Sequence, residues 1–147
     1  MNLKPWLCAA GVTLRDSINA AYPERDKRSD GWIADARHLA GGVSDHIADK
    51  VTGVCRAIDV DRDLHGLPKP DEMPYLADQL RLLAKSKRDG GRIAYLIFDG
   101  FIASPKKSWA WRKYLGANQH RAHLHCSFTS KGDKDGSLFT IPLLQGE

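Results

Sequence analysis

Two histidines and an aspartate in separate parts of this sequence have the chemistry needed to bind a zinc ion. His46 and Asp59 lie in the first half of the chain, and His125 closes a cluster that also contains His120 and His123. A catalytic zinc site uses three protein ligands and leaves a fourth position open for water, and imidazole nitrogens and a carboxylate are suitable ligands. The alternative to a zinc site is that these residues are ordinary surface histidines without a metal.

The pattern around the last two histidines predicts a β-strand. Residues 123–128 alternate polar with apolar or aromatic side chains, which is typical of a half-buried strand. Alternate side chains of a strand share a face, so His123 and His125 should point to one side and Leu124 to the other. This strand therefore offers two nitrogens, of which only one needs to bind metal.

Asp59 lies in an apolar, β-prone stretch from Val54 to Val60, which predicts a strand that carries the carboxylate into the interior. A buried carboxylate is costly unless it is paired or binds a metal. The alternative is an aspartate that caps a turn or forms a salt bridge with Arg56 or Arg62.

These motifs together resemble a known enzyme family. The order Ser44-Asp45-His46, Gly53, Ala57-Ile58-Asp59 and His120 to His125 is similar to the signature of the zinc-dependent D-alanyl-D-alanine carboxypeptidase and L-alanyl-D-glutamate peptidase family. That family cleaves the stem peptides of peptidoglycan. The resemblance implies zinc as the cofactor and zinc ligands at His46, Asp59 and His125.

Within that family, the chain resembles more narrowly the peptidase domains of actinobacteriophage endolysins. The stretch from Arg25 to His46 carries this narrower resemblance, and the whole resemblance runs from about Pro5 to Phe128. The gap between His46 and Asp59 is longer than is usual in the family. Residues 47–52, which fill it, are expected to form a turn that leaves the ligand geometry intact.

The general base departs from the family pattern. The family places an acidic residue three positions before the last histidine, where this chain has Ala122. Alanine cannot accept a proton, so another side chain must activate the water. His123 is the first candidate and Asp61 and His120 are the alternatives, because reach to the water decides which group acts as base.

The resemblance also suggests residues that bind the substrate. An arginine holds a substrate carboxylate in the family, and Arg25 or Arg28 is the candidate here, with a surface salt bridge as the alternative for each. His38 is expected to contact the substrate or to support a ligand rather than to bind zinc. Ser44, from the Ser-x-His motif, completes the predicted substrate-binding set.

Composition favours one globular domain spanning residues 1–147. The hydrophobic content of 42% excludes a disordered or fibrous chain. Cys8, Cys55 and Cys126 are odd in number and lack metal-ligand spacing, so we expect buried core residues that form neither disulfides nor metal bonds, made in a reducing compartment. We expect a monomer.

A net charge of +4 favours contact with an anionic polymer, and both cell wall and nucleic acid fit that description. Basic and aromatic residues alternate between Lys106 and Tyr114, a pattern that could stack bases, grip a glycan or simply face solvent. Because no nucleic-acid-binding motif is present, bacterial peptidoglycan is the expected partner, without specific nucleic acid. The alternative functions are a metal-dependent nuclease and a non-catalytic cell-wall-binding domain.

The N-terminal segment is a weak candidate for a signal peptide. Its apolar run from Trp6 to Val12 is short and contains Gly11, and no stretch of the sequence has the length of a membrane span. We therefore expect no signal peptide and no membrane association. The resemblance implies synthesis in the host cytoplasm and release to the wall through a holin. No segment has the character of a separate wall-binding module.

The order of elements predicts an α+β fold, with a small central antiparallel sheet that carries the metal site and is flanked by helices. Residues 131–137 should form a polar turn or linker before a C-terminal strand or tail. Helices are predicted over Leu7–Ala21, Trp32–Leu39 and Met73–Ser86, strands over Val54–Val60, Arg92–Phe98, Phe101–Ala103, His123–Phe128 and, as strand or tail, Leu138–Leu144, and a loop over Lys106–Gly116.

Overall fold

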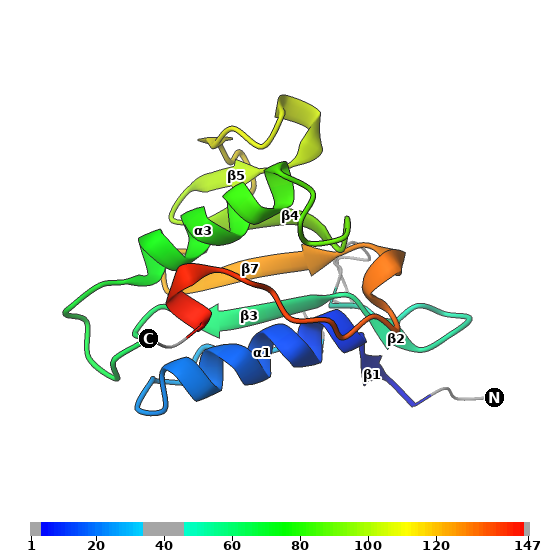
Figure 1. Ribbon diagram of the computed structural model, residues 1–147, viewed down its shortest axis with the longest axis horizontal. Helices are drawn as coiled ribbons and strands as arrows, with labels where there is room; N and C mark the ends of the chain where they lie inside the picture. Colours follow the sequence, from blue (N-terminus) through cyan, green and yellow to red (C-terminus); the bar gives the residue numbers. More distant parts are fainter. Residues whose placement is uncertain (1–3, 34–45, 146–147) are drawn as a thin grey trace.

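A five-stranded antiparallel sheet forms the centre of the molecule in the computed structural model, which describes residues 4–33 and 46–145 (Figure 1). The fold is α+β, as predicted. The elements along the chain are β1 (Trp6–Leu7), α1 (Ala9–Ala21), β2 (Val54–Cys55), β3 (Ala57–Asp61), α3 (Met73–Lys85), β4 (Ile93–Phe98), β5 (Phe101–Ala103), β6 (Arg112–Lys113) and β7 (His123–Phe128), with short 3-10 helices η1 (Pro105–Lys107), η2 (Ser130–Gly132) and η3 (Pro142–Leu144).

The sheet has the order β3-β7-β4-β5-β6, so the histidine-bearing strand β7 lies between β3 and β4. Asp59 is directly opposite His125 in the β3–β7 pair, and Leu96 is opposite Cys126 in the β4–β7 pair. The β4–β5 hairpin predicted from Asp99-Gly100 is present, and both turn residues have the positive φ angles that such a two-residue turn requires.

Strand alternation gives the sheet one apolar face and one polar face. Ile58 of β3, Leu96 of β4, and Leu124 and Cys126 of β7 are buried in the hydrophobic core. Asp59 and His125 alternate with these residues and so lie on the opposite face. The predicted opposition of Leu124 to the two histidines of β7 is confirmed by the burial of Leu124 in this core.

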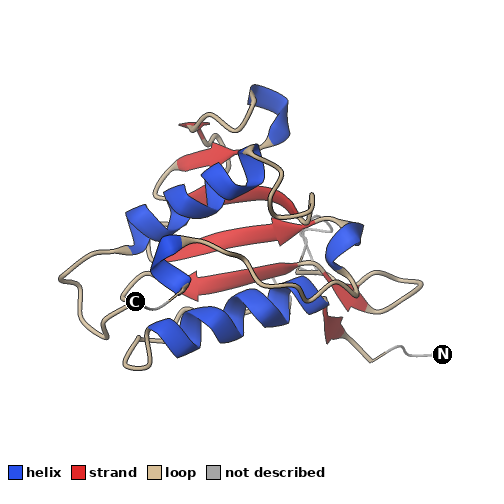
Figure 2. Ribbon diagram, viewed as in Figure 1, coloured by secondary structure: helices blue, strands red, loops and turns tan. Residues whose placement is uncertain are grey.

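Both described helices pack on the apolar face of the sheet. Leu14 and Ile18 of α1 and Leu76 and Leu80 of α3 belong to the same core as the inward strand residues. The C-terminal segment containing η3 crosses between the two helices and contacts both (Figure 2). The opposite face of β3 and β7 is thereby left for polar side chains. Among the described residues, no helix has the length and apolar character needed to cross a membrane.

The first half of the chain differs from the prediction in two details. Trp6 and Leu7 precede the first helix and pair in parallel with Val54 and Cys55, because Trp6 N donates to Gly53 O and Cys8 N donates to Cys55 O. The predicted strand Val54–Val60 is interrupted at Arg56, whose side chain forms a bidentate ion pair with Asp133. The predicted helix Trp32–Leu39 falls largely outside the described residues.

The second half also departs in detail. The predicted loop Lys106–Gly116 contains the end of η1 and the short strand β6. Residues 131–137 contain the end of η2, a bend at residues 133 and 134 and then irregular chain. Of the two forms predicted for Leu138–Leu144, a strand or a tail, the structure has a tail that ends in η3. The three cysteines are buried and form no disulfide, as predicted.

Candidate metal centre

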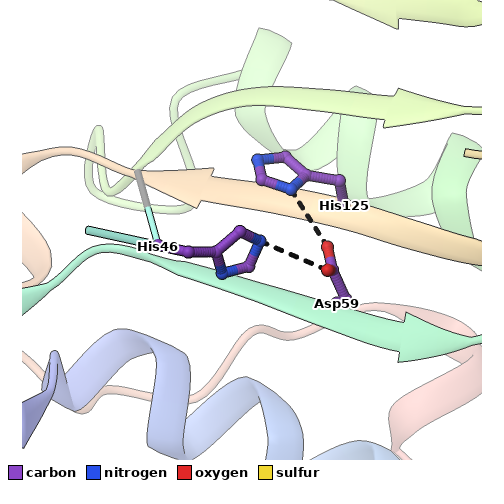
Figure 3. Close-up of side chains that lie close together, drawn as sticks. All are labelled: His46, Asp59 and His125. Atoms are coloured by element: carbon purple, nitrogen blue, oxygen red, sulfur yellow. Dashed lines mark hydrogen bonds and ion pairs between the residues drawn. The ribbon is translucent and has the colours of Figure 1, made fainter. Parts of the chain in front are cut away.

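The pairing of β3 with β7 brings Asp59 and His125 together. The two residues are direct partners in the antiparallel register. The Nδ1 atom of His125 lies 3.0 Å from Oδ1 of Asp59 (Figure 3). Two ligand atoms from distant parts of the chain are thus positioned by rigid strands, which fix side chains more accurately than loops do.

His46 reaches the same carboxylate from the turn that precedes β2. Its Nε2 atom lies 3.2 Å from Oδ2 of Asp59 (Figure 3). Asp49 closes the turn, since its backbone N–H donates to Val54 O and its backbone carbonyl accepts from Gly53 N. The carboxylate of Asp49 also accepts backbone N–H groups of residues 51 and 52. The turn expected in the lengthened segment is therefore present, and it returns the chain so that His46 faces Asp59.

The second ring nitrogen of each histidine is held by another group. Nδ1 of His46 donates to the backbone carbonyl of Trp32 at 3.2 Å, and Nε2 of His125 lies 2.8 Å from the hydroxyl of Ser127. Such outer contacts orient histidines that bind metals. A carbonyl oxygen only accepts, so a neutral His46 carries its proton on Nδ1 and presents a lone pair to Asp59. The lone pair of His46 Nε2 and the carboxylate oxygen of Asp59 repel each other, and a proton or a cation between these two atoms removes that repulsion.

The donor set fits zinc. At zinc–ligand distances of about 2.0–2.1 Å, neighbouring ligand atoms of a tetrahedron are about 3.3 Å apart. The two separations from the oxygens of Asp59, 3.2 Å to Nε2 of His46 and 3.0 Å to Nδ1 of His125, are close to that value. Ligand atoms of all three residues lie within 4.8 Å of one another. Two imidazoles and a carboxylate are also the ligand types that suit a divalent transition metal.

The electrostatics of the cluster favour an ionised carboxylate. Burial by itself would raise the pKa of Asp59, but the interactions of the carboxylate with His125 and His46 outweigh it and lower the pKa well below its usual range. An ionised carboxylate between two imidazoles is the charge distribution that a divalent cation requires.

The two remaining histidines of the cluster lie beside Asp59 as well. The ring of His120 is 5.0 Å from that of His123 and 5.2 Å from that of His125. Nδ1 of His120 donates to the carbonyl of Asn118 at 2.8 Å, which leaves Nε2 as the lone-pair nitrogen of a neutral ring. Burial, and then the neighbouring His125 and His123, lower the pKa of His120 to about 4.

His123 has an unusual environment. Its Nε2 atom is buried without a hydrogen-bond partner among the described residues, and it lies 3.6 Å from Oδ1 of Asp59. Burial lowers the pKa of His123, and the opposing attraction of Asp59 is too small to restore it. Buried polar atoms are normally hydrogen-bonded, so Nε2 of His123 has the capacity to accept one further partner.

Arg25, predicted to bind the substrate, is engaged in an ion pair inside the protein. Its side chain is fully buried, and its guanidinium forms a bidentate ion pair with Asp30 while Nε donates to Asn19. Asp30 in turn accepts the backbone N–H of Asp61 at 2.7 Å. Arg25 therefore secures residues 25–31 against β3, next to the Gly31–Asp59 bridge, and has no donor directed to a substrate.

Arg28, the other arginine predicted to bind a substrate carboxylate, lies at the surface. Its side chain is exposed and pairs with Asp26 at 2.8 Å. It lines a depression of about 360 Å³ together with Ser29 and Ala122. The other two predicted substrate residues, His38 and Ser44, lie outside the described residues.

Asp61 is opposite His123 in the β3–β7 pair, but its oxygens contact other groups. Its oxygens accept from the hydroxyl and backbone N–H of Ser29 and from the backbone N–H of Asp63. It groups instead with Asp26 and Asp63. These contacts argue against Asp61 as the general base and leave His123 and His120.

Four residues that contact the candidate metal centre are not predicted from the sequence. Ser127 could have been found from its spacing, because it lies two residues after His125 on the same strand face. Tyr95 stacks on His125 with ring centroids 5.6 Å apart, and it comes from the neighbouring strand β4. The carbonyls of Trp32 and Asn118 leave no signal in the sequence, because backbone atoms are common to every residue.

Comparisons with known proteins returned no matching family model, curated protein or solved structure.

Proposed function

We propose that this protein is a zinc metallopeptidase that hydrolyses an amide bond in the stem peptide or cross-bridge of bacterial peptidoglycan. The observation that carries the proposal is the cluster of His46, Asp59 and His125. In this cluster, each histidine ring directs one nitrogen to the same carboxylate, and its other nitrogen contacts the Trp32 carbonyl or the Ser127 hydroxyl. The similarity of the sequence motifs to the peptidase family supplies the substrate class.

His46, Asp59 and His125 would hold the zinc ion. When bound, zinc polarises the scissile carbonyl and activates a water molecule for attack. The protein's own contribution at this point is orientation: Trp32 and Ser127 fix the two rings, and the β3–β7 pair fixes the carboxylate. Rigid placement of ligands of this kind lowers the cost of reaching the reactive geometry.

We assign proton transfer to His123. Its Nε2 has no hydrogen-bond partner among the described residues and lies on the same face as the proposed ligands. In this assignment, Nε2 accepts a proton from the attacking water and returns it to the leaving amine. Ala122, at the family's usual base position, lines the depression beside Arg28 and supplies no proton acceptor.

His120 and Arg28 are proposed to contact the substrate. The ring of His120 lies against those of His123 and His125, and its lone-pair nitrogen can accept a hydrogen bond from a peptide N–H. Arg28 is exposed in the adjoining depression, where its guanidinium can pair with a carboxylate of the stem peptide.

The biological setting follows from the same resemblance. We propose an endolysin-type enzyme of a bacteriophage, made in the host cytoplasm and released to the wall through a holin during lysis. The net charge of +4 favours adsorption to anionic wall polymers.

Digestion of purified sacculi tests the proposed function. Zinc-loaded protein should release peptide fragments that mass spectrometry identifies by the new amino and carboxyl ends, while plasmid DNA in a parallel reaction stays intact. His46→Ala should release none. His65→Ala is the matched control, because His65 pairs with Glu72 and belongs to none of the candidate ligand groups among the described residues, so release should be unchanged.

Two results would contradict the proposal. Cleavage of the plasmid with intact sacculi would point to a nuclease that uses the same ligands. Tight binding to sacculi without fragments at any zinc concentration would point to a non-catalytic wall-binding domain.

A further inference from the structure

A second set of potential metal ligands shares Asp59 with the first. Ligand atoms of Asp59, His120 and His123 lie within 4.8 Å of one another. The Nε2 atom of His123 is 3.6 Å from Oδ1 of Asp59 and is buried without a hydrogen-bond partner among the described residues. A buried imidazole nitrogen that makes no hydrogen bond and lies beside a carboxylate can bind a metal ion together with that carboxylate.

His120 is oriented to take part. Because its Nδ1 donates to the Asn118 carbonyl, the nitrogen left to bind a cation is Nε2. The backbone N–H of His120 also donates to the side-chain oxygen of Asn118 at 3.0 Å, which fixes the residue in its positive-φ conformation. Its ring packs edge-on against that of His123, so both rings border the same space.

Asp59 has enough oxygen atoms for two cations. Its Oδ2 faces His46, while its Oδ1 faces His123 and His125. A carboxylate carries two oxygens with about four lone-pair positions. Carboxylates that bridge two metal ions about 3.5–4 Å apart are a known arrangement in hydrolytic sites.

We propose that Asp59, His120 and His123 form a second, weaker site for a divalent transition-metal ion, and that filling it inhibits hydrolysis. The site is weaker because Oδ1 of Asp59 is shared with His125 and because two cations on one carboxylate repel each other. The inhibition rests on the proposed function, since a His123 nitrogen that binds a cation cannot accept a proton. The binding itself does not rest on that function.

Metal stoichiometry tests the site without reference to activity. Metal-free protein is titrated with Zn²⁺, and separately with Co²⁺, by equilibrium dialysis with elemental analysis. The wild type should bind two ions per chain in two resolved steps. His46→Ala should lose the tighter step, His120→Ala should lose the weaker step, and His65→Ala should keep both.

Activity on sacculi tests the consequence. The rate should rise up to one equivalent of zinc and fall several-fold as the second step fills. In His120→Ala, the fall at excess zinc should disappear, whatever the basal rate of that variant.

The outcomes separate the two proposals. One ion per chain at saturation, or a second ion retained in His120→Ala and in the double variant with His123→Ala, would overturn the second site alone. Two ions without a fall in rate would overturn its inhibitory role. Two-step binding without hydrolysis at any zinc concentration would overturn the proposed function and leave the second site standing.

Discussion

Nε2 of His125 lies 2.8 Å from the hydroxyl oxygen of Ser127, and Nδ1 of the same ring lies 3.0 Å from Asp59. Residues 125 and 127 share a face of β7 because strand side chains alternate. The strand itself therefore supplies both a candidate ligand and the group that orients it.

Removal of this hydroxyl should weaken metal binding. We expect Ser127→Ala to lower zinc affinity by about 10–100-fold, the usual effect of losing a group that orients a ligand. Competition with a chromophoric chelator measures the change. Ser86→Ala is the control, because the Ser86 hydroxyl donates to Leu83 O near the end of α3, and it should leave affinity unchanged. Equal affinities for Ser127→Ala and the wild type would refute the orienting role.

Zinc should stabilise the fold through the proposed ligands. A ligand that binds only the native state at 100 times its dissociation constant adds about 2.7 kcal/mol to the free energy of unfolding. Urea unfolding with and without zinc should show a shift of this size for the wild type and for His65→Ala. His125→Ala should show little or none. A full shift in His125→Ala would remove that residue from the ligand set.

Arg25 should be a stability residue. Its side chain is fully buried against Asp30, and breaking a buried ion pair typically costs about 3–5 kcal/mol because one charge is left unpaired. We expect Arg25→Ala to lose that amount in urea unfolding. The exposed Arg28, which pairs with Asp26, is the matched control, and Arg28→Ala should unfold at nearly the wild-type urea concentration. Wild-type stability of Arg25→Ala, with impaired substrate binding, would reverse this assignment.

Patterns within short stretches of the sequence predicted the strands and the turn that position the site. The alternation of residues 123–128 predicted β7 and the shared face of His123 and His125, and the apolar stretch before Asp59 predicted its strand. Asp99-Gly100 predicted the β4–β5 hairpin because a two-residue turn needs positive φ angles. The pairing of β3 with β7 then brought Asp59 and His125 together.

Tertiary contacts decided what the sequence left open. Burial of Arg25 depends on where Asp30 and Asn19 fold, and an arginine in a polar, turn-rich segment has no pattern that predicts it. Asp61 is an alternative base by residue type, but Ser29 and Asp63 donate hydrogen bonds to its oxygens. Main-chain partners such as the Trp32 carbonyl appear only once the chain has folded.

Substitution of His123 tests whether this residue replaces the acidic general base that the family has at the position of Ala122. His123→Ala at one equivalent of zinc should keep the metal and the fold but lower kcat on sacculi by about 10²-fold or more, the usual scale for general acid-base help. Zinc content, measured beside the rate, distinguishes this role from ligation. If His123 were a ligand of the first ion in place of His125, the substitution would remove that ion. Near-wild-type hydrolysis would end the assignment and leave His120 as the remaining histidine, because Asp61 already has its oxygens engaged.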